Sequence, residues 1–316
     1  MSPGTPPPEA LPAGAEPARV LARYGRQYTI ERDAQPGLEE EAIPLGRSFA
    51  AVPGDRVLCV PGEGRRTLVR VLERRSLLHR AEGDRVKELA ANVDQVVVVF
   101  APQPAFQAPF LWRALLAAGE AGLECLAVRN KADMISAEAD AMLAQLGSLG
   151  AATLTLRARG DPAAVVAALA PRLAGRASVL VGQSGVGKST LLNLLLGTSE
   201  RTGALSRGGT RGRQTTTTAR WFGLADGGAL VDSPGFQDFG LDHIEPARLA
   251  AALPDLARIE GECRFQDCLH RDEPGCRIGR ALGEGRLDPA RYAFYRELLE
   301  RLLTRQRERR TAPRRG

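Results

Sequence analysis

The pattern of hydrophobic and polar positions changes several times along the chain, and each change marks a predicted module. Residues 1–40 are rich in Pro, Ala and Gly, so we predict a disordered lead-in, with a first strand near Gln27–Glu31 as the exception. Residues 41–92 show short alternating runs separated by Pro-Gly and Gly-rich turns, which is typical of a small all-β module. An OB-fold barrel fits this pattern, and a β cap on the following domain is the alternative.

From Val93 the pattern becomes that of an α/β domain. Continuous apolar runs, as expected for strands buried on both faces, occupy residues 93–100, 125–130 and 178–183. Helical patterns follow these strands at residues 110–122, 137–149, 162–173 and 188–197. Residues 221–233 have the pattern of two strands in a hairpin. Alternating strands and helices predict a mostly parallel sheet over residues 93–242.

The last part of the chain is predicted to be helical and to end in a basic tail. Residues 243–302 form a third module, with its final helix over Pro289–Arg301. Residues 301–316 hold seven Arg and one Glu, a surplus equal to the net charge of +6 of the whole chain. We therefore treat residues 303–316 as a separate tail, either a solvated end or a phosphate-seeking arm for nucleic acid.

One segment matches the phosphate-binding loop pattern GxxxxGK[ST] and lies between a predicted buried strand and a helix. Glycines let backbone N–H groups surround phosphate oxygens, and the helix N-terminus adds favourable dipole charge. Lys188 is expected to reach the β- and γ-phosphates, and Ser189 to ligate Mg²⁺. The candidate phosphate-binding residues are Gly182, Gln183, Ser184, Gly185, Val186, Gly187, Lys188, Ser189 and Thr190.

A second motif selects the base. Asn130, Lys131 and Asp133 form an NKxD motif directly after a predicted strand. The Asp carboxylate accepts from the guanine N1–H and 2-amino group, while Asn supports the loop and Lys covers the ring. Adenine offers neither donor there and would leave the carboxylate unpaired. NKxD precedes the phosphate loop here, so we predict a circularly permuted GTPase domain, which the close termini of a layered sheet permit.

Two further segments have the features of nucleotide-sensing switches. Asp232 to Gly235 fit DxxG, in which Asp232 holds Mg²⁺ through water and the Gly235 N–H senses the γ-phosphate. The long polar stretch before it contains Thr215–Thr217, one of which we expect to bind Mg²⁺ and the γ-phosphate. The sequence does not fix which of the three it is, and we choose Thr216. Phe236 follows the second switch where many GTPases have a water-orienting Gln, so the catalytic group must come from elsewhere.

The cysteines suggest a metal site and a reducing compartment. Cys263, Cys268, His270 and Cys276 give three thiolates and one imidazole in a short loop, which suits structural tetrahedral Zn²⁺. The total of five cysteines is odd, and no secretory signal begins the chain. These observations argue against a disulfide framework and for a cytoplasmic protein. No apolar run approaches the length of a membrane span.

In this order, the motifs resemble the ribosome small subunit-dependent GTPases of the RsgA/YjeQ family. The resemblance runs from about Arg47 to Glu300. It implies a multidomain α/β architecture with an OB-fold, a permuted P-loop GTPase domain and a helical zinc-binding domain. It also implies GTP hydrolysis stimulated by the small ribosomal subunit during its late maturation.

The sequence departs from the family pattern at two places. Gln214 occupies the place of a family His proposed to assist hydrolysis, and residues 155–162 lack the Ser of the family's guanine-side loop.

The motifs thus favour a Mg²⁺-dependent GTP hydrolase, expected to be a cytoplasmic monomer, and the resemblance implies that it acts on the small ribosomal subunit and its rRNA. Lys188, Thr216 and Asp232 would support catalysis, with Gln214 positioning water. Because the second switch leads into the zinc module, we expect nucleotide state to reposition that module. The alternatives are an RNA-binding assembly factor that senses GTP with little hydrolysis, and an ATP-dependent P-loop enzyme with a coincidental NKxD.

Overall fold

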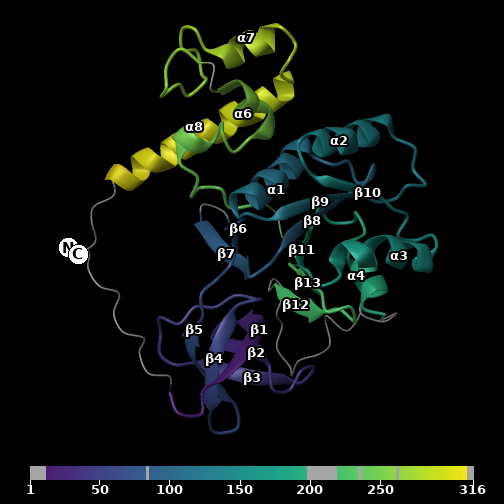
Figure 1. Ribbon diagram of the computed structural model, residues 1–316, viewed down its shortest axis with the longest axis vertical. Helices are drawn as coiled ribbons and strands as arrows, with labels where there is room; N and C mark the ends of the chain where they lie inside the picture. The colour runs from purple at the N-terminus through teal and green to yellow at the C-terminus, as the bar shows by residue number, and fades with distance from the viewer. Residues whose placement is uncertain are drawn as a thin grey trace.

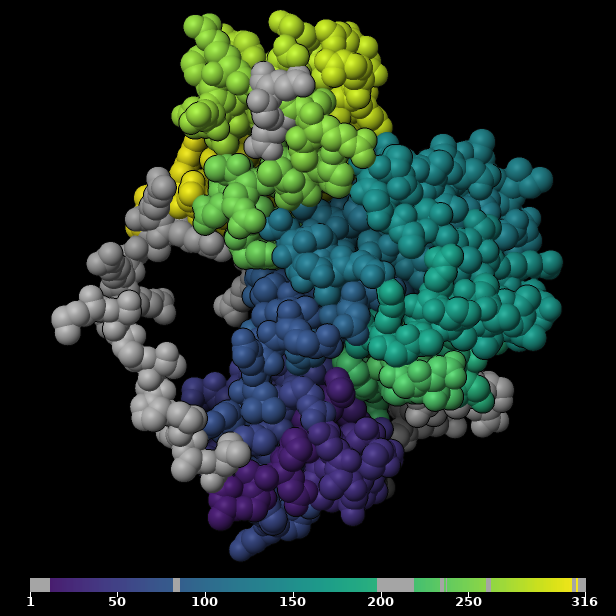
Figure 2. All heavy atoms as spheres, viewed as in Figure 1, coloured from purple at the N-terminus to yellow at the C-terminus, as the bar shows by residue number. Residues whose placement is uncertain are grey.

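The computed structural model describes residues 12–82, 85–197, 219–233, 236, 238–260 and 263–311. Three parts lie in sequence along the long axis: a β-barrel, a sheet flanked by helices, and a helical module (Figure 1). Figure 2 shows the central part in contact with both of the others. Within the described residues, no helix is long and apolar enough to cross a membrane.

The N-terminal barrel has five strands and its own core. They are β1 (Glu16–Tyr24), β2 (Gln27–Arg32), β3 (Glu39–Pro44), β4 (Arg56–Pro61) and β5 (Arg66–Val71). β1 pairs with both β2 and β4, and β3 pairs with β5, which closes the barrel. Val20, Ile30, Val57 and Leu68 fill its interior.

The barrel corrects the predicted lead-in. Residues 1–40 were expected to be disordered apart from one strand near 27–31. β2 confirms that strand. The expectation of disorder is wrong for β1 and for the start of β3. β1 is rich in Ala and Arg, which have modest strand preference, so its sequence hides a strand that barrel closure stabilises.

The expected β module of residues 41–92 also extends beyond the barrel. β6 (Leu77–Glu82) and β7 (Arg85–Ala91) form a separate antiparallel pair. Leu78 and Leu89 in this pair belong to the core shared with the central domain rather than to the barrel core. Alternation alone did not distinguish this hairpin from barrel strands, because both have one apolar face.

The central sheet has the order β10-β9-β8-β11-β13-β12. Its strands are β8 (Gln95–Phe100), β9 (Glu124–Arg129), β10 (Ala152–Thr155), β11 (Ala177–Val181), β12 (Arg220–Gly223) and β13 (Ala229–Asp232). All neighbouring pairs are parallel except β12–β13, which confirms the predicted parallel sheet and terminal hairpin. The Ala22↔Arg220 pair joins β1 to β12 and links this sheet to the barrel.

Helices cover both faces of the sheet. They are α1 (Ala108–Glu120), α2 (Ala137–Ser148), α3 (Pro162–Leu173) and α4 (Lys188–Leu195). Val96 and Val98 of β8 face the core of α1 and α2, whereas Val97 and Val99 face that of α3 and α4. Alternate residues thus serve two cores, which explains the continuous apolar run of this strand.

The C-terminal module packs on α1. It contains a 3₁₀ turn at Pro246–Arg248, α6 (Pro254–Glu260), α7 (Arg277–Gly283) and α8 (Pro289–Thr311). The predicted separate tail from residue 303 is therefore wrong as far as Thr311, because α8 continues to that residue. The Arg-, Gln- and Glu-rich stretch has high helix preference, and an Arg305–Glu308 ion pair one turn apart supports it.

Candidate functional site

The loop between β11 and α4 has the backbone of a phosphate-binding loop. Gly182, Gly185 and Gly187 have φ values of 150°, 80° and 107°. A Cβ at Gly182 would lie 2.2 Å from the carbonyl oxygen of Val99, so only glycine fits there. α4 begins immediately after the loop, and the free N–H groups of its first turn are suited to an anion.

The ammonium group of Lys188 lies over this loop. Its Nζ donates to the carbonyl oxygens of Gly182 at 2.6 Å and Gln183 at 2.8 Å. Burial lowers the pKa of Lys188, and the nearby Asp232 carboxylate partly opposes that shift. The positive charge is thus already in place for phosphate oxygens. Ser189 and Thr190 follow in the first turn of α4, and Ser189 is exposed.

Asp232 ends β13 beside the phosphate loop. It pairs in register with Leu180 of β11, and because the two strands are parallel, their carboxyl ends meet at one edge of the sheet. The residue is 8% exposed. Burial raises the pKa of Asp232, and Lys188 counteracts the rise. A carboxylate and an ammonium therefore share this edge, as expected of a site for a metal–phosphate complex.

Asn130 joins the base-reading motif to the phosphate loop. It follows β9 and is buried. Its Nδ2 donates to the carbonyl oxygen of Val186 at 2.8 Å, and its Oδ1 accepts from the backbone N–H of Ala158 at 3.0 Å. The side chain thereby fixes the motif against the phosphate loop and against the loop after β10.

The other two residues of the motif point outward from this anchor. Lys131 has a φ of 57°, and its Nζ donates to the carbonyl oxygen of Gln103 at 2.7 Å. Asp133 is half exposed, and its carboxylate lies 3.8 Å from the Arg157 guanidinium. An exposed carboxylate whose ion pair is long and solvated remains available to a ligand.

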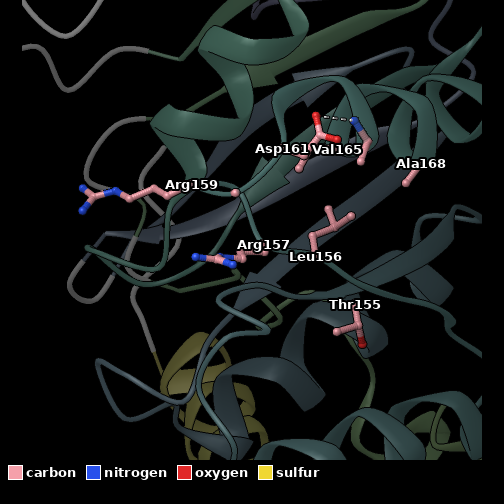
Figure 3. Close-up of a pocket in the computed structure, with 9 residues that line it drawn as sticks. Thr155, Leu156, Arg157, Arg159, Asp161, Val165 and Ala168 are labelled. Carbon is pink, nitrogen blue, oxygen red and sulfur yellow. Dashed lines mark hydrogen bonds between the residues drawn. The ribbon is translucent and has the colours of Figure 1, made fainter.

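The loop after β10 borders an open groove of about 640 Å³ on the side of α3. Figure 3 shows Arg157 and Arg159 extending from this loop, while Val165 and Ala168 lie on α3. Asp161 caps α3 by accepting from the backbone N–H of Ala163 at 2.9 Å. Arg157 lies in the segment that lacks the Ser expected from the family resemblance. From this loop it forms the ion pair with Asp133.

Three predicted site residues lie outside the described residues: Gln214, Thr216 and Gly235. Phe236, which follows the second switch motif, is buried against Phe239, with ring centroids 4.7 Å apart, and against Phe110 of α1 at 6.2 Å. An aromatic ring in this cluster anchors the segment to the core, which agrees with the expectation that it does not orient water.

The segment after the second switch is attached to its surroundings on two sides. Its backbone bonds to β6, where the Ala81 N–H donates to the Asp238 carbonyl and the Gly240 N–H to the His79 carbonyl, both at 3.0 Å. On the other side, Arg113 of α1 pairs with the Asp238 carboxylate at 2.6 Å. The segment is therefore held between the hairpin and α1.

The Cys/His cluster assembles into a site that could hold a metal ion. The four ligand atoms of Cys263, Cys268, His270 and Cys276 all lie within 4.8 Å of one another. His270 Nδ1 is 3.4 Å from the Cys263 sulfur and 3.6 Å from the Cys276 sulfur, so Nδ1 is the ring nitrogen that faces the thiols.

Helix α8 supports this cluster through the backbone of the loop. Tyr295 donates to the carbonyl oxygen of Leu269 at 2.6 Å, and Tyr292 to that of His270 at 2.8 Å. The Glu273 carboxylate accepts from the backbone N–H groups of Leu269 and Arg271. The loop on both sides of His270 is thus fixed by residues beyond the four ligands, as is usual around metal centres.

Sequence reasoning missed the contribution of the segment after β8. The Gln103 carbonyl holds Lys131, and a Cβ on Gly185 would lie 3.5 Å from Pro104, so this segment lies against both binding loops. Its position could have been predicted from the sequence, because the carboxyl end of β8, a central parallel strand, must lie at the same edge of the sheet as the motifs.

Comparison with known sequences gives concordant matches. The family described as RsgA GTPase matches residues 71–242. A protein from Ralstonia pickettii (strain 12J), named Small ribosomal subunit biogenesis GTPase RsgA, is 42% identical over 295 residues, covering 91% of this chain and 93% of its own. One of the same name from Burkholderia pseudomallei (strain K96243) is 42% identical over 285 residues, covering 89% and 90%.

Solved structures show the same architecture. The crystal structure of YjeQ from Thermotoga maritima matches with a TM-score of 0.68 at 27% identity, covering 92% of this chain and 99% of its own. YloQ, described as a circularly permuted GTPase, matches with a TM-score of 0.67 at 21% identity, covering 96% and 98%. These matches support the predicted multidomain architecture, and this chain's own structure shows the barrel, the central sheet and the helical module with its Cys/His cluster.

Proposed function

Because the chain belongs to the RsgA GTPase family, we propose that it hydrolyses GTP at the phosphate-loop site in the service of small ribosomal subunit biogenesis, the role that its relatives' names state. The observation that carries the proposal is the bond from Asn130 to Val186, which joins a guanine-reading motif and a phosphate loop into one nucleotide site. A bare P-loop would not select guanine, and a bare NKxD motif would bind no phosphate.

Within this site the proposed roles follow from chemistry. Asp133 reads the guanine N1–H and 2-amino group, Asn130 and Lys131 shape its loop, and residues 182–190 surround the phosphates. Lys188 neutralises charge that develops on the phosphate oxygens. Ser189, Thr216 and Asp232, the last through water, would hold Mg²⁺, which adds positive charge at the phosphates when bound. Gln214 would orient water, and the Gly235 N–H would contact the γ-phosphate.

We assign zinc to the Cys/His cluster. Tetrahedral Zn²⁺ with Zn–S near 2.3 Å and Zn–N near 2.05 Å places sulfur and nitrogen about 3.6 Å apart. The observed separations of 3.4 and 3.6 Å between His270 Nδ1 and two of the sulfurs fit that geometry. With four protein ligands the site would be closed and structural.

The partner we propose is the small ribosomal subunit with its rRNA, which places the protein in the cytoplasm. The net charge of +6 suits a polyanionic partner. Nucleotide state could reach α8 through Asp242, which lies after the second switch and pairs with Arg301 at 3.0 Å and Arg305 at 3.6 Å. Indistinguishable hydrogen-exchange protection of α8 in the GTP- and GDP-bound protein would contradict this coupling.

The first test is GTP turnover by the full chain with and without purified small ribosomal subunits. We expect stimulation of at least about tenfold, lost in Lys188→Ala, because that variant removes the charge that binds the phosphates and neutralises the charge that develops on them. Subunit binding without stimulation would favour a GTP-sensing assembly factor. Absence of both would reject the ribosomal role while leaving GTP hydrolysis to be judged from the basal rate.

A further inference from the structure

We propose that Arg129 is a positioning residue: it holds the far end of the guanine-reading loop and thereby sets nucleotide affinity and base selectivity. This inference rests on the proposed role of Asp133 in that loop. Arg129 is the last residue of β9, directly before the NKxD motif. It does not contact the base-reading carboxylate itself, so its effect would pass through the loop backbone.

Arg129 contacts the end of the loop and the helix that follows it. Its guanidinium is only 5% exposed. Nη2 donates to the carbonyl oxygen of Met134 at 2.8 Å, and Nε lies 3.0 Å from the carboxylate of Asp140 in the first turn of α2. Burying a guanidinium costs free energy unless it is paired, so this residue is costly at the position unless both partners are in place.

Other bonds fix the start and the middle of the loop. The backbone N–H of Asn130 donates to Phe100 at 2.8 Å, and that of Ala132 donates to Leu156 at 2.9 Å. Lys131, between them, has a positive φ, a backbone conformation that strains a non-glycine residue. Arg129 bonds to the Met134 carbonyl, beyond Asp133, so the Asp133 carboxylate lies between the bonded residues Ala132 and Met134.

A guanidinium suits this place because its planar group donates to the Met134 carbonyl through Nη2 while its Nε side forms an ion pair with Asp140. A lysine could pair with Asp140 or donate to the Met134 carbonyl, but its single ammonium has no such planar group. A leucine or methionine could fill the volume, but it would make neither the hydrogen bond to Met134 nor the ion pair with Asp140. Loop geometry, rather than packing, is therefore what a substitution would change first.

The experiment compares Arg129→Met with Arg32→Met in the full chain, by measuring the dissociation constants for GDP and for IDP, which lacks the 2-amino group. Arg32 is a matched control because it is another poorly exposed arginine, paired with Glu16 and Glu40 in the barrel, away from the nucleotide. We expect Arg129→Met to weaken GDP binding about tenfold and to reduce the GDP-over-IDP preference several-fold. Arg129→Lys should be intermediate.

Kinetics separate positioning from a general loss of stability. Arg129→Met should raise the KM for GTP and leave kcat within about twofold, because the phosphate site is unaltered. Arg32→Met should lower the unfolding midpoint without changing either dissociation constant. A folded Arg129→Met that keeps wild-type GDP affinity, or that weakens GDP and IDP equally, overturns the inference.

Two further variants keep the test decisive. If Arg129→Met does not fold, Asp140→Ala, at a largely exposed position, should weaken GDP binding about two- to threefold. An unchanged GDP affinity would overturn the inference.

Asp133→Asn tests the proposed function separately. If it leaves guanine selectivity intact, the proposed reading of the base fails; if it removes selectivity while the Arg129 variants do not, only the positioning role fails.

Discussion

The side-chain amide of Asn130 donates to the backbone carbonyl of Val186 at 2.8 Å, although 56 residues separate the two in the chain. The same side chain accepts from the backbone N–H of Ala158. One buried residue thus connects the base-reading motif, the phosphate loop and the loop after β10. Because the link is made in three dimensions, the permuted order of the motifs does not prevent a complete nucleotide site.

Because of this close contact, position 187 has no room for a side chain. A Cβ there would lie 2.2 Å from Asn130 Nδ2, and φ is 107°. We expect Gly187→Ala to weaken GDP binding on the order of 100-fold, equivalent to about 3 kcal/mol of strain and lost contact. Isothermal titration with GDP would measure this loss.

The matched control for this substitution is Gly119→Ala in α1, where a Cβ has nothing within 4 Å. It should raise the free energy of unfolding by about 0.5–1 kcal/mol and leave GDP affinity unchanged. Equal GDP affinity in both variants would show that the close approach of Gly187 to Asn130 does not matter for binding.

The metal assignment predicts a specific loss on mutation of one ligand. Cys268→Ser should reduce bound zinc from about one ion per chain to a small fraction, and the loop before α7 should become sensitive to protease, because its contacts depend on the ligand set. Elemental analysis of purified protein measures the zinc. Cys125→Ala, which removes a buried cysteine away from the cluster, should keep its zinc. Zinc retained by Cys268→Ser would argue against the four-ligand site.

One buried ion pair joins α6 to α8 inside the C-terminal module, next to α1. Arg291, with 2% of its side chain exposed, makes two 2.8 Å bonds to Asp255, and its guanidinium stacks 5.0 Å from the Trp112 ring of α1. Arg291→Met leaves Asp255 unpaired and should cost about 3 kcal/mol in urea unfolding. The double variant Arg291→Met with Asp255→Leu should recover more than half of that loss. Additive losses would show that the two residues stabilise the module independently.

The contact between β6 and the second switch segment should weaken in acid. Burial lowers the pKa of His79, and His243, whose ring is 4.9 Å away, lowers it further, while Glu88 opposes the shift. A lowered folded-state pKa gives stability that is fully present above the unfolded value of about 6.5 and is lost as pH falls through the folded pKa. The effect should stay below about 1 kcal/mol, because the ring is only partly buried.

The check is the free energy of unfolding of His79→Gln between about pH 7.5 and 5.5. The variant should lose less stability than the wild-type protein over this range, since it has no imidazole to protonate at that position. An identical pH slope in the two proteins would assign the acid sensitivity to other groups.

Much of the architecture was predictable because local pattern and burial agree. β8, β9 and β11 are continuous apolar runs whose alternate residues serve two cores, so the sequence alone identified them. β1 was missed because its Ala- and Arg-rich sequence has no strong strand preference, and its stability comes from pairing with β2 and β4. The helix beyond Arg301 was missed because dense positive charge indicated a tail, whereas α8 continues to Thr311.

For function, the sequence by itself determined the chemistry: phosphate loop, guanine-reading motif and metal-ligand set are short, and their residue types and spacing specify what they bind. Only the tertiary structure decided how these parts are joined. The bond from Asn130 to Val186, the hold of Arg129 on Met134 and the attachment of the second switch to β6 all link residues whose proximity depends on chain folding. Such contacts carry no local signal, because a hydrogen bond to a backbone carbonyl can be made to any residue type.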